Sequence, residues 1–162
     1  MAAQAKSYPG EVATAEDVFL LAEEYNTAAG VLLGLGRSGE PFSRAPFRLA
    51  AIHAIELYLN ALLLIEGFHP AQVRGLGHDL AVRAEFVLAS GLSLRGRTAA
   101  HLIAMAKGRE YLVSRYGTDQ MSTLSQINRL QATLKEIRSK AGKRLGANYW
   151  IQSDTSLFRA IV

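Results

Sequence analysis

Apolar residues recur at three- and four-residue intervals along most of the chain, which is the spacing of one face of an α-helix. The first such segment covers residues 15–33. Thr14 is a candidate N-cap for it, and Glu16 and Asp17 place negative charge in the first turn. Glycines and then Pro41 interrupt the pattern. The sequence therefore predicts a surface helix over residues 15–33, followed by a loop.

The second segment is apolar on nearly every side, which is typical of a helix surrounded by others. It runs from about Pro46 to Glu66 and stops at a glycine. His53, Glu56 and Asn60 are its polar exceptions. At 100° per residue the three fall within about 60° of one another, so they form one stripe facing the same neighbour.

Three further helices are predicted from the same periodicity. A short one lies within residues 78–91, the next begins at a cap on Thr98 and ends at Gly117, and a fifth spans 121–145. No stretch alternates polar and apolar residues as a half-buried strand does. The predicted fold class is all-α, an antiparallel up-and-down bundle of four to five helices in a single domain. The tail, 146–162, fits no long helix. It is apolar enough to reach across a partner subunit, so we expect a homodimer.

Composition narrows the kinds of chemistry available. The chain has no cysteine, which excludes disulfides and thiolate metal sites. Its four histidines have no paired ligand spacing, so no metal site is expected. The first residues lack an apolar segment of signal-peptide length, and no apolar run is long enough to cross a bilayer. We therefore expect a cytoplasmic protein that does not reside in a membrane.

Charge is distributed unevenly along the chain. Residues 1–40 carry a net charge of −4 and the remainder carries +8, for a total of +4. Basic residues surround the narrow apolar seam of the predicted helix over 121–145. Such a surface favours an anionic partner such as RNA, DNA or a nucleotide, but it also serves simply to solvate a fold.

The acid on the central helix requires a partner, because a buried charge without one costs several kcal/mol. If 98–116 is one continuous helix, Arg109 falls in the middle of its apolar side and Arg115 at the edge. We therefore predict that Glu56 pairs with Arg109 or Arg115, while Asn60 and His53 complete the hydrogen bonds. Such a network is either a structural lock between helices or a polar pocket for a phosphate or base.

Three segments together resemble HEPN domains, which are small helical bundles linked to nucleotide or RNA handling. They are AIHAIELYLNALLLIEG, GHDL at 77–80 and EYLVSRYGTD at 110–119. The resemblance covers about residues 45–119. It matches Glu56 to the acid of the family's second helix and His78 to the histidine before its third. The closing Tyr and Arg-Tyr of the family match Tyr111, Arg115 and Tyr116.

This chain departs from the family pattern in several places. Asn60 stands where many relatives have Lys, and Gly117 replaces a proline that often follows Arg-Tyr. RNase members carry an arginine followed at a set spacing by a histidine on the late helix. Here no histidine follows Arg109 or Arg115, since His101 is the last in the chain. The resemblance therefore implies a non-catalytic module that binds a nucleotide or RNA.

Two alternatives stay open at this point. One is a metal-independent endoribonuclease of toxin type, as in toxin–antitoxin pairs, and the other is a structural interaction subunit of a nucleotidyltransferase complex. The resemblance also implies a nucleotidyltransferase-type protein as a partner.

The predicted organisation is one HEPN-like domain over 1–162, with a bundle core at about 14–119, a basic fifth helix at about 121–145 and the tail at 146–162. No catalytic residue, cofactor or metal is predicted. His78 and Asp79 are expected to form the start of a helix. The predicted ligand-binding or buried polar network consists of His53, Glu56, Asn60, Arg109, Tyr111, Arg115 and Tyr116.

Overall fold

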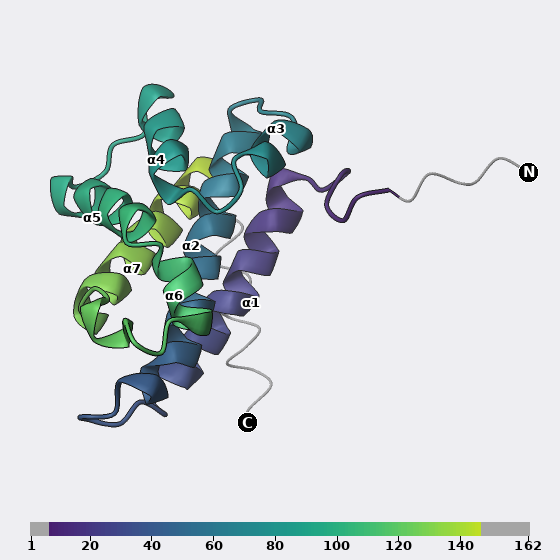
Figure 1. The fold of residues 1–162 in the computed structure, drawn as a ribbon. Helices are drawn as coiled ribbons and strands as arrows, with labels where there is room; N and C mark the ends of the chain where they lie inside the picture. Colours follow the sequence, from purple (N-terminus) through teal and green to yellow (C-terminus); the bar gives the residue numbers. More distant parts are fainter. Residues whose placement is uncertain (1–6, 147–162) are drawn as a thin grey trace, which may run out of the picture.

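The structure, a computed structural model, describes residues 7–146, and every regular element in that range is helical (Figure 1). The predicted all-α class is confirmed. The described residues form seven α-helices, rather than the four to five expected, and two short 3-10 helices. The α-helices are α1 Ala15–Leu33, α2 Ala45–Ile65, α3 Pro70–Gly75, α4 Leu80–Ala89, α5 Gly96–Lys107, α6 Glu110–Tyr116 and α7 Ile127–Leu145, and the 3-10 helices are η1 Pro41–Arg44 and η2 Met121–Thr123.

Helix α1 begins at the predicted cap. The Thr14 hydroxyl accepts a hydrogen bond from the Asp17 backbone N–H at 3.1 Å, and the Asp17 carboxylate accepts one from the Thr14 N–H at 3.0 Å. This reciprocal pair satisfies N–H groups that a helix start leaves without intrahelical partners. The helix then lies along α2 (Figure 1).

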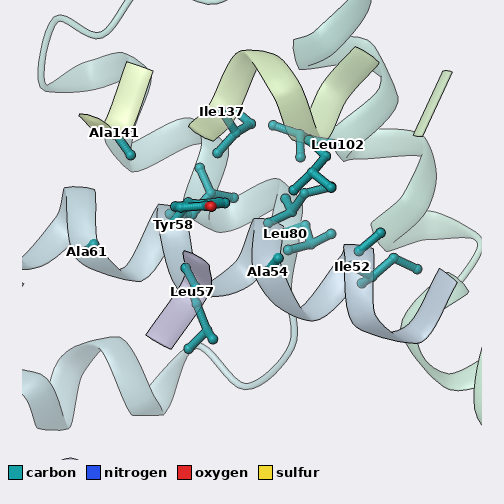
Figure 2. Close-up of a cluster of buried hydrophobic side chains, with 14 of the residues drawn as sticks. Ile52, Ala54, Leu57, Tyr58, Ala61, Leu80, Leu102, Ile137 and Ala141 are labelled. Atoms are coloured by element: carbon teal, nitrogen blue, oxygen red, sulfur yellow. The ribbon is translucent and has the colours of Figure 1, made fainter. Parts of the chain in front are cut away.

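Helix α2 forms the centre of the molecule, as its apolar composition predicts. Figure 2 shows its side chains Ile52, Ala54 and Tyr58 among residues of other helices. Those contributed by α4, α5 and α7 include Leu80, Leu102, Ile137 and Ala141, all at most 2 % exposed. Burial on this scale is the main source of stability in a bundle, at about 25 cal/mol per Å² of apolar surface.

The helix predicted from Thr98 to Tyr116 is instead two helices. Gly108 ends α5, and Arg109 adopts a left-handed conformation, with φ 50°, before α6 begins. This turn redirects the chain, so the faces of α5 and α6 are not related by 100° per residue. Thr98 is not the cap of α5. It lies buried inside the helix, and its hydroxyl donates to Glu136 Oε2 at 2.5 Å.

A further short helix, α3, lies between the helices predicted over about 46–66 and within 78–91, where no helix was predicted. Pro70 stands at its first position, where the missing N–H is harmless. The His69 ring accepts from the Ala71 N–H at 3.2 Å, and the Gln72 side chain accepts from the His69 N–H at 2.7 Å. The sequence feature that indicates this helix is a proline at the first helical position, preceded by a residue whose side chain can cap the helix. The tail expected to reach a partner subunit lies outside the described residues, apart from Gly146.

Within the described residues, one helical segment, Pro41–Ile65, is long and apolar enough to cross a membrane by those two criteria alone. Of its most apolar window, 67 % is buried inside the protein. The core helix of a bundle has the same composition, because it is surrounded by apolar neighbours instead of lipid.

Candidate functional site

The polar stripe of α2 opens into a pocket of about 600 Å³. Its walls come from α1, α2, α3, α4, the connection between α3 and α4, and the segment before α1. Polar side chains on the wall include His53, Glu56, Asn60, Arg74, His78 and Arg83. The stripe predicted from the sequence therefore faces a cavity rather than a sealed helix interface.

Glu56 is buried, with 10 % of its side chain exposed, and its carboxylate meets two basic groups. Its Oε2 lies 3.0 Å from His78 Nδ1, and its Oε1 lies 3.7 Å from Arg83 Nη2. The prediction that Arg109 or Arg115 pairs with Glu56 is therefore wrong. The basic groups come instead from α4, which carries Arg83, and from the connection just before it, which carries His78.

Arg83 was missed by the sequence reasoning, although a signal for it exists. Leu80, Ala84 and Val87 form the buried face of α4, and Arg83 lies on the same face by helical spacing. It is 1 % exposed. A guanidinium on the apolar side of a helix has to meet acceptors, which would have pointed to the acid on α2.

The Arg83 guanidinium fixes the connection that carries His78. Its Nε donates to Asn60 Oδ1 at 2.7 Å, and its Nη2 donates to the Gly77 carbonyl at 2.7 Å. Three more carbonyls accept from it at longer distances, those of Val73, Leu76 and Asp79. Burial lowers the pKa of Arg83, while Glu56 and Asp79 oppose this effect. Arg83 thus links the α2 stripe to the loop opposite it.

His78 lies at the edge of the pocket with 46 % of its side chain exposed. Its ring is 5.0 Å from that of Tyr111, measured between centroids. With Nδ1 directed at Glu56, Nε2 makes no hydrogen bond to any other described residue. Asp79 is the N-cap of α4 and accepts from the N–H groups of Ala81 and Val82, at 2.9 and 3.1 Å. His78 and Asp79 do stand at a helix start, but only Asp79 caps it.

His53 is the second imidazole on the pocket wall. It is half-buried and meets the Tyr25 ring edge-on, with centroids 4.4 Å apart. Burial lowers its pKa, Glu56 opposes that shift, and Arg115 and His78 lower the pKa further. The pKa of the ring thus lies below its ordinary value of about 6.5, which favours the neutral form at pH 7.

The structure brings only part of the predicted network together. His53, Glu56 and Asn60 line the pocket. Tyr111 does not line it, but its ring lies against that of His78, which does. The remaining three are exposed on or beside α6: Arg109, Arg115 and Tyr116. Arg109 was predicted to point inward, but it is exposed. The left-handed turn at this residue ends the continuous helix on which that prediction depended.

A separate buried ion pair joins α2 to α6. Glu110, 5 % exposed, accepts from the Ser125 N–H at 2.8 Å and from its hydroxyl at 2.9 Å. Arg48 Nη1 lies 3.8 Å from Glu110 Oε2, and Arg48 Nη2 donates to the Ser125 carbonyl at 2.6 Å. This cluster ties the start of α2 to α6 and to the residues before α7, and it does not line the pocket.

No group of histidine and acidic side chains in residues 7–146 is arranged to hold a metal ion. Comparison with protein-family models, with curated proteins and with solved structures gave no match. The likeness to HEPN domains therefore rests on the sequence motifs, and the function has to be argued from the pocket.

Proposed function

We propose that this protein is a HEPN-like module that binds a nucleotide, free or at the end of an RNA, in the pocket beside α2. The observation that carries this proposal is the pocket itself. It has about 600 Å³ of space, largely apolar walls and a few converging polar groups. Small-molecule sites in proteins have this volume and this composition.

The pocket offers complementary surroundings to the parts of a nucleotide. Leu21, Leu57 and Val73 contribute apolar surface for a base. Arg74, which lies 4.1 Å over the Tyr8 ring, supplies a cation at the wall for a phosphate. An exposed guanidinium suits a phosphate because it donates in a planar fork.

The positions that carry the HEPN resemblance also support the proposal. Glu56 and His78 are within hydrogen-bonding distance, and His78 lies against Tyr111. Three segments that are separate in the sequence thus supply neighbouring side chains, and two of these, Glu56 and His78, line the pocket.

The test compares two leucines of similar exposure on α1. Leu21 lines the pocket and is 48 % exposed, whereas Leu20 is 42 % exposed and does not line it. We expect Leu21→Trp to fill the pocket and to weaken nucleotide binding at least about tenfold, which is about 1.4 kcal/mol. Leu20→Trp is the matched control and should bind as the unmodified chain does.

Isothermal titration calorimetry at low salt, with the four nucleoside 5′-monophosphates and a short single-stranded RNA, measures the effect. Both variants should show the helical circular dichroism of the parent. If no nucleotide or RNA binds the parent chain, or if both tryptophan variants bind equally well, the pocket is not the site.

A second function, metal-independent RNA cleavage, is favoured by the Glu56–His78 pair. A carboxylate that holds one imidazole nitrogen leaves the other free to accept or donate a proton. RNA brings its own nucleophile, the 2′-hydroxyl, so neither a protein nucleophile nor a metal is required. The neutral His53 ring on the same wall provides a second proton-transfer group.

Incubation of the purified chain with single-stranded RNA in a chelator tests this second function. Cleavage that is lost in His78→Asn and in His53→Asn, while Leu20→Trp retains it, would support the enzyme. Binding without cleavage in the parent chain would leave the binding module alone.

A further inference from the structure

The hydrogen-bonding groups on the pocket wall differ in kind, and this difference bears on which base fits. Glu56 and Asn60 are four residues apart on α2, so their side chains are neighbours on one face. Both line the pocket. One is a charged acceptor, and the orientation of the other is set by Arg83.

Glu56 retains unused acceptor capacity. An ionised carboxylate has about four lone-pair sites. His78 Nδ1, at 3.0 and 3.3 Å from the two oxygens, is the one hydrogen-bonding partner among the described residues. The contact to Arg83 Nη2, at 3.7 Å, is too long for a hydrogen bond. The carboxylate can therefore accept from N–H groups of a ligand.

Asn60 presents the opposite character. An arginine N–H needs an acceptor, so the bond from Arg83 Nε, at 2.7 Å, holds the amide oxygen of Asn60 toward α4. The amide nitrogen, with its two N–H donors, makes no hydrogen bond within the described residues. An acceptor and a donor thus stand side by side on the pocket wall.

We propose that the pocket selects guanine, a proposal that rests on the proposed nucleotide site. The guanine edge carries two adjacent donors, N1–H and the 2-amino group, next to the acceptor O6. The two donors match the two oxygens of the Glu56 carboxylate, and O6 matches the Asn60 amide nitrogen. Adenine places a lone pair at N1, which faces the carboxylate unfavourably, and has a donor where guanine has O6.

Asn60 has a specific part in this selection. A lysine at this position would neutralise Glu56 and occupy its lone pairs with a strong donor. The neutral amide leaves the carboxylate free and adds a donor beside it. Asn60, which stands where many relatives have Lys, is then a determinant of base specificity.

Calorimetry with GMP, IMP and AMP on the full chain tests the assignment. IMP has N1–H and O6 but lacks the 2-amino group. We expect GMP to bind about tenfold more tightly than IMP, and AMP to bind more weakly still. Glu56→Gln should reduce GMP affinity at least about tenfold and change AMP affinity little.

Asn60→Asp is the second variant, and it keeps an acceptor for Arg83, so the fold is expected to survive. It replaces the donor with a charge that repels O6, and GMP affinity should fall at least about tenfold. Thermal melting followed by circular dichroism confirms that both variants are folded.

The outcomes separate the two proposals. Equal affinities for GMP and AMP, a preference for AMP, or GMP binding unchanged in both variants would overturn guanine selection while leaving the pocket as a nucleotide site. If none of the three binds the parent chain while CMP, UMP or single-stranded RNA does, guanine selection is overturned and the nucleotide site stands. If none of these ligands binds, the proposed nucleotide site is overturned together with guanine selection.

Discussion

Glu56 lies inside the bundle with its carboxylate facing the His78 ring and the Arg83 guanidinium. Glu110 is buried in a similar way against Arg48. Each acid enters the interior with a basic partner because an unpaired buried charge would cost several kcal/mol. The two pairs differ in one respect: that of Glu56 borders a pocket, and that of Glu110 does not. Pairing accounts for the presence of an acid on α2, and the adjacent cavity is what suggests function.

His101 makes stability depend on pH. It is 6 % exposed, and burial lowers its pKa; Arg129 and Arg48 lower it further, while Glu110 opposes them. The unfolded chain, with a pKa of about 6.5, therefore takes up the proton first as the pH falls. We expect the free energy of unfolding to be unaffected by this group above about pH 6.5 and to decrease below that value.

The measurement is urea unfolding at pH 7.5 and pH 5. His101→Gln can still hydrogen-bond Thr133, which lies 2.8 Å from the ring Nδ1, but it cannot gain a proton. It should show a smaller loss of stability between the two pH values than the parent. Burial lowers the pKa of His53 as well, so part of the loss should persist. An equal loss in both proteins would contradict the role of His101.

Tyr58 joins α1, α2 and α7 through its hydroxyl. The side chain is fully buried, and its hydroxyl donates to Glu23, whose carboxylate also accepts from Arg138 at 2.7 Å. Burial and the Glu23 carboxylate raise the pKa of Tyr58 well above its ordinary value, so it remains a donor. We expect Tyr58→Phe to lower the free energy of unfolding by about 1–2 kcal/mol.

Tyr25→Phe is the matched control for this change. Tyr25 is 37 % exposed, and its hydroxyl makes no hydrogen bond to another described residue. Its replacement should change stability by less than about 0.5 kcal/mol. Similar effects in the two variants, in urea unfolding at pH 7.5, would argue against a stabilising role of the Tyr58 hydroxyl.

At the scale of helices, two glycines, Gly117 and Gly30, have opposite effects on stability. Gly117 ends α6 so close to the preceding turn that an added Cβ would lie 2.7 Å from Val113 Cγ1 and 3.0 Å from Val113 Cα. Gly30 lies within α1, where an added Cβ would meet nothing within 4 Å. The first glycine is required by a close contact, and the second only weakens its helix.

We therefore expect opposite signs for two alanine substitutions. Gly117→Ala should destabilise the fold by about 1–3 kcal/mol, because Val113 backbone atoms would have to move. Gly30→Ala should stabilise it by about 0.5–1 kcal/mol, since alanine favours the helix. Thermal unfolding of both variants beside the parent gives the comparison. A stabilised Gly117→Ala would show that the end of α6 adjusts freely.

At the scale of the whole molecule, the helices arrange their apolar faces around α2, yet α1 retains apolar side chains on its outer surface. Val31 is 68 % exposed and Leu35, just beyond the helix, is 62 % exposed. Apolar surface of this kind is common at interfaces between subunits. The homodimer expected from the sequence stays a prediction, and this surface gives it a test.

Light scattering coupled to size-exclusion chromatography measures the mass in solution. We expect the parent chain at twice its 17.6 kDa mass, and Val31→Glu combined with Leu35→Glu at the monomer mass. Val12→Glu, at a site 91 % exposed before α1, is the control and should remain dimeric. A monomeric parent would end the dimer prediction, and a dimeric double variant would place the interface elsewhere.

Local signals in the sequence were enough for the helix class, for the Thr14 cap and for the central position of α2. Helical periodicity and capping depend on residues within about four positions of one another, so they can be read from one segment at a time. The stripe of His53, Glu56 and Asn60 follows from the same periodicity. These features were determined by the sequence alone.

The partners of that stripe were decided by the tertiary structure. One residue with a left-handed backbone, Arg109, separates α5 from α6 and turns the predicted inward guanidinium outward. Arg83, more than twenty residues from Glu56 and Asn60 in the chain, lies beside the stripe where Arg109 was predicted, and it orients the amide of Asn60. Which side chains meet across helices depends on how the chain turns between them, and no helical period within a segment contains that information.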